Sequence, residues 1–104
     1  MKKLSTLVTL LLSGCAIFGP SYSGNTTADY FLKFDTEMMI NTFFRADHNC
    51  IPDSIYTEII EIPKQGNAHE IWTATGCNHT EKFDIYYIAD PKGGTYLSIK
   101  PIKQ

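Results

Sequence analysis

The sequence predicts an α+β fold in which one N-terminal helix packs on a four-stranded antiparallel β-meander, with one disulfide. Apolar residues between Asp29 and Phe44 recur at spacings of three and four, which is typical of an amphipathic helix. From Ile55 onward apolar and polar residues alternate, which is typical of strands. Cys50 and Cys77 can then cross-link a domain whose core is small.

The composition is that of one small globular domain. The chain has 104 residues, of which 43% are hydrophobic and 12% aromatic, and this content argues against disorder. The formal net charge is -2, and the nine basic residues are spread along the chain. Because binding to phosphates needs clustered Lys and Arg, we expect no nucleic-acid partner.

The N-terminus has the pattern of a targeting segment. Lys2 and Lys3 precede an uncharged run over residues 4–12 that contains five leucines, and small residues follow it. This run is too short to cross a bilayer, which takes about 20 apolar residues, so we expect a cleaved signal peptide over residues 1–14. Its removal takes away two lysines and no acid, which changes the net charge to -4.

The residues Leu12-Ser13-Gly14-Cys15 match the lipobox of bacterial lipoproteins. The chain therefore resembles the small lipoproteins of this class. The resemblance implies that Cys15 becomes the lipidated N-terminus and holds the protein to the cell envelope. Ala16, which is not Asp, implies sorting to the outer membrane facing the periplasm in a two-membrane bacterium. The alternative is an ordinary secretory signal cut near Gly14 or Ala16.

Between the lipid and the domain, the sequence predicts a flexible tether over residues 15–28. This stretch mixes Gly, Pro, Ser, Asn and Thr without a period, as linkers and turns do. A flexible chain of this length has an r.m.s. reach of roughly 20 Å. We expect the globular domain to cover residues 29–104.

The helix predicted from Asp29 places a stripe of apolar side chains, mainly Phe and Met, at helical spacing: Phe31, Phe34, Met38, Met39, Ile40 and Phe43. Packing of this stripe on the sheet is the simplest interpretation, and a lipid- or ligand-binding groove is the alternative. A second version has residues 30–34 as a strand and a shorter helix capped by Asp35 or Thr36.

Four strands are predicted after the helix. The first runs from Ile55 and ends before Pro63, and a turn over residues 64–67 leads into the second. We expect the later strands over residues 69–75, 82–89 and 95–102, with a turn over residues 90–94. Pro101 places the last of them at an edge or marks its end.

The cysteines left after Cys15, Cys50 and Cys77, are expected to form a disulfide, since an exported domain lies in an oxidising compartment. The predicted hairpin register places Ser54 opposite Cys77, so the two sulfurs fall at the same end of the hairpin. A closed loop of about 28 residues contributes about 3.5 kcal/mol of stability in the chain-entropy model.

A metal site is the alternative at the same residues. His48-Asn49-Cys50 and Cys77-Asn78-His79 are mirror-image triplets, and each offers an imidazole and a thiolate to zinc or copper. This spacing is not a known zinc-finger pattern, and thiolates in an oxidising compartment usually become cystine. We therefore expect no metal or other cofactor.

No catalytic motif accompanies the remaining polar residues. His69 beside Glu70 lacks a recognisable nucleophile or oxyanion loop. Trp72, Tyr86, Tyr87 and Tyr96 are expected mainly in the core and in cross-strand packing, with a sugar- or peptide-binding surface as the alternative. The sequence thus predicts a non-catalytic envelope protein that the lipid holds to the membrane and that binds an envelope protein partner.

Overall fold

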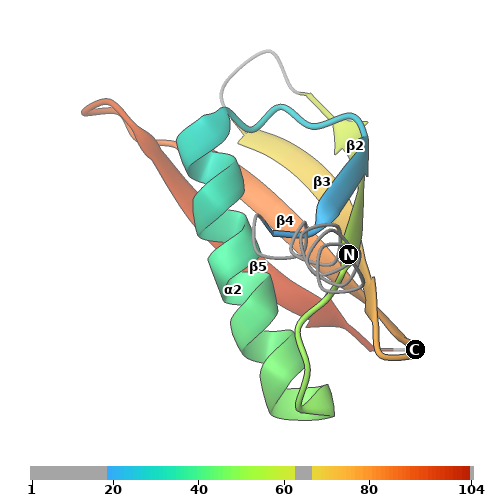
Figure 1. Cartoon of the computed structure of the whole chain (residues 1–104). Helices are drawn as coiled ribbons and strands as arrows, with labels where there is room; N and C mark the ends of the chain where they lie inside the picture. The colour runs from blue at the N-terminus through green and yellow to red at the C-terminus, as the bar shows by residue number, and fades with distance from the viewer. Residues whose placement is uncertain (1–18, 63–66, 104) are drawn as a thin grey trace, which may run out of the picture.

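The computed structural model describes residues 19–62 and 67–103, and within them a helix covers one face of a mixed five-stranded sheet (Figure 1). In chain order the elements are β1 (Ser21–Gly24), α2 (Tyr30–His48), β2 (Ser54–Glu61), β3 (Asn67–Gly76), β4 (His79–Ala89) and β5 (Thr95–Ile102). The strands lie in the same order in the sheet. The predicted α+β class is confirmed.

The strand count and the strand directions differ from the prediction. β1 precedes the helix and pairs with β2 in parallel, whereas the pairs β2–β3, β3–β4 and β4–β5 are antiparallel. The sheet is therefore mixed, and α2 is the crossover that a parallel pair requires. The prediction of four antiparallel strands was wrong at this edge, while β5 forms the other edge as Pro101 indicated.

The strand that the sequence did not predict, β1, lies within the stretch predicted to be a tether. Tyr22 is the only large apolar residue of β1, and its ring packs edge-on against Trp72 with 6.0 Å between ring centroids. At Gly24, where φ is +88°, an added Cβ would lie 2.0 Å from the Thr57 carbonyl oxygen. A short strand rich in Ser and Gly carries too weak a pattern to be recognised, so residues 21–24 were missed.

Helix α2 begins and ends at residues with standard capping geometry. Asp29 is the N-cap, and its side chain accepts a hydrogen bond of 2.8 Å from the Leu32 backbone N–H. Asn49 ends the helix in the left-handed conformation, at φ 55°, and its N–H donates to the Arg45 carbonyl. The longer of the two predicted helices is therefore correct, and it continues to His48.

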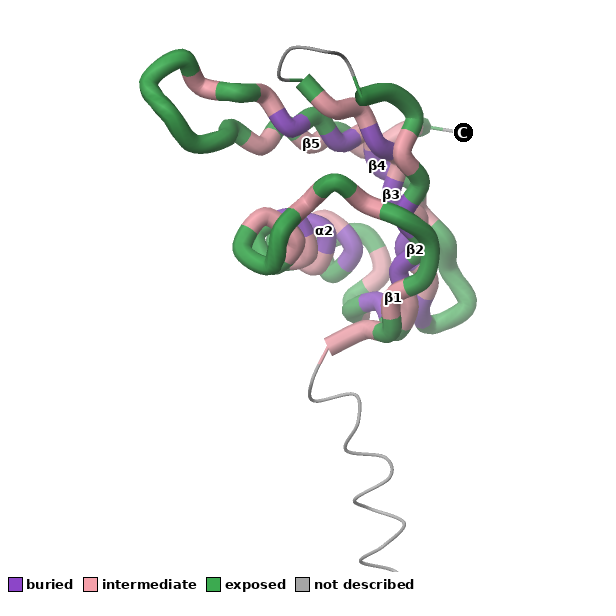
Figure 2. The backbone as a smooth tube through the Cα atoms, turned by 90° about the horizontal axis from the view of Figure 1, so that it is seen from above, coloured by how far each residue is buried: buried purple, intermediate pink, exposed green. Residues whose placement is uncertain are grey.

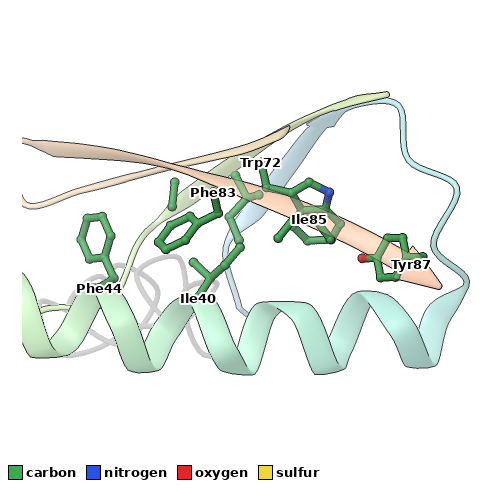
Figure 3. Close-up of a cluster of buried hydrophobic side chains, with 8 residues drawn as sticks. Ile40, Phe44, Trp72, Phe83, Ile85 and Tyr87 are labelled. Carbon is green, nitrogen blue, oxygen red and sulfur yellow. The ribbon is translucent and has the colours of Figure 1, made fainter. Parts of the chain in front are cut away.

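The core lies between α2 and the inner face of the sheet (Figure 3). Ile40 and Phe44 of the helix are fully buried there. The strands contribute the other buried apolar side chains, which are Ile55, Trp72, Ala74, Phe83, Ile85 and Tyr87. The Tyr87 hydroxyl lies 2.6 Å from that of Thr36, so the polar end of this ring is also paired.

The turn between β3 and β4 consists of Cys77 and Asn78, both with positive φ, at 50° and 65°. The β2–β3 register also differs from the prediction by two residues: Ser54 pairs with Thr75 and not with Cys77, and the ladder has a bulge between Ile59 and Glu61. The Cys77–Asn78 turn requires a small residue before it. Gly76 is that residue, because an added Cβ would lie 2.8 Å from the Pro52 Cα. The predicted turn between β2 and β3 falls largely on residues 63–66, which are outside the described residues.

Candidate functional site

The predicted disulfide joins Cys50 and Cys77, with 6.6 Å between their Cα atoms. Cys50 follows the C-cap of α2, and Cys77 is in the β3–β4 turn, so the bridge ties the end of the helix to the tip of a hairpin. The pairing is confirmed, although the register that led to it was wrong by two residues. Residues 48–50 and 77–79 therefore do meet at one corner of the domain.

The histidines of the two triplets stack on each other at this corner. The rings of His48 and His79 are 4.0 Å apart between centroids and nearly parallel, at 13°. Stacked rings do not direct their nitrogens at one ion, and the disulfide removes both thiolates. The four-residue metal set of His48, Cys50, Cys77 and His79 is therefore not formed in this structure.

Two carboxylates adjoin His48 instead. The Nε2 atom of His48 lies 2.8 Å from Oε2 of Glu81, and Asp47 completes a group whose ligand atoms all lie within 4.8 Å of one another. The two atoms are close but not aligned for a hydrogen bond, and neither has another hydrogen-bond partner among the described residues. Burial and the neighbouring Asp47 raise the pKa of Glu81, and His48 opposes this.

Sequence reasoning missed Asp47 and Glu81, although a signal was present. Glu81 follows His79 by two residues, which puts both on the same face of β4, and Asp47 adjoins His48. The group opens into a surface hollow of about 730 Å³ between the end of α2 and the edge strand β5. Asp47 is exposed there, whereas His48 and Glu81 each keep 18% of their side-chain surface exposed.

A second carboxylate, Glu70, is fully buried and has a structural environment. Its Oε1 accepts hydrogen bonds from the Thr26 hydroxyl at 2.7 Å and from Trp72 Nε1 at 2.8 Å. Its Oε2 accepts from the backbone N–H of Thr27 at 2.7 Å and from the hydroxyl of that residue. Glu70 thus fastens the loop before α2 to the middle of the sheet.

The neighbouring His69 points to the opposite side of the sheet, so the adjacency of His69 and Glu70 in the sequence makes no catalytic pair. His69 Nε2 lies 2.7 Å from Oδ1 of Asp84, and its ring stacks on Tyr86 at 4.3 Å. These side chains belong to what we call the outer sheet face, the surface opposite α2. Strand alternation assigns to it Tyr56, Glu58, His69, Ile71, Lys82, Asp84, Tyr86, Tyr96, Ser98 and Lys100.

Three tyrosines project from the outer sheet face. Tyr56, Tyr86 and Tyr96 are 49%, 40% and 60% exposed, whereas Trp72 and Tyr87 are buried on the helix side. The aromatic set predicted from the sequence is therefore divided between the core and the surface. Within the described residues, no element covers this face (Figure 2).

A second apolar surface lies on α2 itself. Phe31, Phe34 and Met38 are 74%, 54% and 53% exposed, and we call them the outer helix stripe. Phe31 lies about 180° around the helix from the buried Ile40, at 100° per residue. The stripe that the sequence suggested for packing on the sheet is therefore divided: Phe31, Phe34 and Met38 face outward, whereas Ile40 is buried and Phe43 packs against the core. Thr36 and Phe44 complete the buried side of the helix.

The lipobox and Cys15 lie outside the described residues, as does the predicted signal peptide. In residues 19–62 and 67–103, no helix is both long enough and apolar enough to span a bilayer. The sequence matches no protein family model, and no curated protein and no solved structure shows significant similarity to it.

Proposed function

We propose that this protein is a non-catalytic, lipid-anchored component of a bacterial cell envelope that binds a protein partner through the outer sheet face. The anchor is the acylated Cys15, in the outer membrane and facing the periplasm if the source has two membranes. Tyr86 carries the binding proposal: it is a solvent-exposed aromatic side chain held rigid by stacking on His69, which Asp84 orients in turn.

The anchor is supported by the order of residues at the N-terminus. Two lysines, a short apolar run and the lipobox stand in the order that lipoprotein signals have. The Cys50–Cys77 disulfide agrees with export, because structural disulfides persist in oxidising compartments. Two or more acyl chains on one cysteine hold a protein stably on a bilayer without a spanning helix.

The composition of the outer sheet face supports a protein partner. Tyr is enriched in protein interfaces because it offers a large contact area and a polar end at low conformational cost. The face also carries Lys82 and Lys100 on β4 and β5, Asp84 opposite Lys100, and Glu58 on β2, so it has charges of both signs as well as aromatic rings. Aromatic side chains among charged ones are typical of a non-obligate protein interface, whose rim is polar.

The anchor is tested by the intact mass of the full-length protein after extraction from membranes. We expect the loss of residues 1–14, a mass gain from acyl chains on Cys15, and a two-dalton deficit from the disulfide. A Cys15→Ser variant should retain the signal peptide and gain no lipid. A wild-type protein that retains Met1, or that lacks acyl chains, contradicts the anchor.

The binding face is tested by a photoreactive amino acid placed at single positions in the lipidated protein in cells. At position 86 or 96 we expect one discrete cross-linked product, because these side chains project from the proposed interface. The exposed Thr42 of α2 is the control and should not give that product. No discrete product at 86 and 96, in protein of the correct mass, rejects this face as the binding site.

A second candidate function is the binding of a divalent metal ion by Asp47, His48 and Glu81. The observation that favours it is the 2.8 Å separation of His48 Nε2 and Glu81 Oε2, two buried atoms without an aligned hydrogen bond. Tetrahedral ligands of one zinc ion at about 2.0 to 2.1 Å lie roughly 3.3 to 3.4 Å apart, so the two atoms would need to separate by about half an ångström to hold an ion. A cation would also relieve the repulsion between the two carboxylates.

Calorimetric titration of the purified full chain with zinc tests this candidate. We expect one equivalent to bind and to raise the melting temperature, and Glu81→Gln to abolish both effects. His69→Ala is the matched control, because His69 and Asp84 form an aligned hydrogen bond on the other side of the sheet. Absence of binding by the wild-type chain rejects the metal function and leaves the contact between His48 and Glu81 as a structural one.

A further inference from the structure

The outer helix stripe is an apolar surface without a partner among the described residues. Phe31, Phe34 and Met38 expose more than half of their surface, and Tyr30 beside them is 78% exposed. Contiguous exposed side chains of this size mark an interaction surface in a small domain. The position of these side chains relative to the N-terminal end of the domain indicates what they contact.

The chain enters the domain directly beside this stripe. An added Cβ at Gly19 would lie 3.3 Å from Oε2 of Glu37 in α2, so the backbone of Gly19 lies against the helix. Gly19 and Pro20 also line a surface hollow of about 410 Å³ together with Tyr30 and Phe34. The first described residues are thus neighbours of the exposed aromatic side chains.

The distance from this point to the lipid attachment residue is short. Cys15 precedes Gly19 by four residues, and a fully extended chain spans at most about 3.6 Å per residue, or roughly 14 Å in total. The anchored end of the chain therefore stays close to the stripe. A long tether would let the domain take any orientation at the membrane, whereas this short one restricts its orientation.

We propose that the outer helix stripe lies on the lipid bilayer, with Phe31, Phe34 and Met38 inserted at the level of the headgroups and upper acyl chains. This inference rests on the proposed acylation of Cys15. Aromatic and Met side chains on one side of a surface helix are suited to this depth, which is about 5 to 10 Å. Because the anchor is on the same chain, even weak affinity of the stripe suffices to hold it there.

Charge on the exposed side of α2 permits this contact. Arg45 and Asp35 are both exposed, and because one is basic and the other acidic, the pair has no net charge to repel an anionic bilayer.

Contact of the stripe with the membrane would fix the orientation of the domain. The outer sheet face is opposite α2 (Figures 1 and 2), so a domain lying on its helix presents Tyr86 and Tyr96 away from the membrane.

The test uses the full-length lipidated protein in vesicles of phosphatidylethanolamine and phosphatidylglycerol. One thiol is introduced by Phe34→Cys or, as the control, by Tyr96→Cys, and it is labelled with an environment-sensitive fluorophore. Nitroxide groups on the upper acyl chain of a lipid then quench fluorophores that reach the bilayer. We expect several-fold stronger quenching, and a blue-shifted emission, at position 34 than at position 96.

A second variant guards against an effect of the label itself. With the label at position 42 on the same side of α2, the changes Phe31→Ser, Phe34→Ser and Met38→Ser together should reduce the quenching. Acylated protein whose label at position 34 is quenched no more than that at position 96 overturns this inference and leaves the anchor intact. Protein without acyl chains by intact mass overturns the anchor and this inference together.

Discussion

The two sides of α2 carry similar side chains in opposite environments. Ile40 and Phe44 face the sheet and are fully buried, whereas Phe31 and Phe34 face away and expose more than half of their surface. Both sides continue the same apolar spacing, and a helix that is apolar on two sides cannot bury both against one sheet. The buried side stabilises the fold, and the exposed side is available for function.

Both ends of α2 are attached to the sheet. The loop before the helix is held by Glu70, and the end of the helix is held by the Cys50–Cys77 bridge. These two attachments hold both ends of α2 to the sheet, with Ile40 and Phe44 buried between them. Four changes test how far the two sides differ.

The largest difference is expected between Phe44→Ala and Phe34→Ala, which remove the same side chain from the two sides. Phe44→Ala should cost about 3 to 5 kcal/mol of the free energy of unfolding, because it leaves a cavity in the core. Phe34→Ala should change it by less than about 0.5 kcal/mol. Urea denaturation of both variants measures this, and equal losses would contradict the assignment of the two sides.

Removal of the disulfide by Cys50→Ala and Cys77→Ala together should cost about 3.5 kcal/mol, because the unfolded chain is no longer restrained. The measurement is again urea denaturation, with the oxidised wild type as the reference. The stacked pair His48 and His79 lies at the same corner, so His79→Ala is a control that leaves the bridge intact. A disulfide-free variant as stable as the wild type would show that the corner needs no cross-link.

The attachment at the start of the helix is tested by Glu70→Gln. An amide can accept hydrogen bonds on its oxygen only, so at least two of the donors from Thr26, Thr27 and Trp72 lose their acceptor. The expected cost is about 1 to 3 kcal/mol. Glu58→Gln on the exposed outer sheet face is the matched control, and an equal effect there would refute the role of the buried carboxylate.

The smallest effect is expected from Glu81→Gln, and it depends on pH. Burial and Asp47 raise the pKa of Glu81 above its ordinary value of 4.5, so the folded state binds this proton more tightly than the unfolded state. The favourable contribution is present below pH 4.5 and is lost as the pH rises through the raised pKa. Glu81→Gln should therefore melt at a higher temperature than the wild type at neutral pH.

The advantage of Glu81→Gln should shrink as the pH falls through the raised pKa and should be smallest below 4.5, where the carboxyl is protonated in both the folded and the unfolded state. Melting temperatures of both proteins across this range provide the measurement. A variant that is less stable than the wild type at neutral pH would show that the attraction to His48 exceeds the cost of burial and of Asp47.

The sequence predicted the elements whose signals are local. The limits of β5 match the expected residues 95–102, and the alternation in β3 and β4 separated the buried from the exposed residues. The cysteine count indicated the disulfide. The Ile59–Glu61 bulge and the Cys77–Asn78 turn had no such signal, because neither contains the Gly or Asn-Gly pattern that marks these features.

Periodicity, turn chemistry and cysteine pairing alone determined that this chain has a helix, a run of hairpins and a bridge, because each acts over a few residues or requires only a count. Tertiary structure decided which side of α2 is buried, that β1 joins the sheet, and that Asp47 meets Glu81. These outcomes depend on contacts such as those from Glu70 to Thr26 and Thr27, 44 and 43 residues away. No local pattern records a partner that far along the chain.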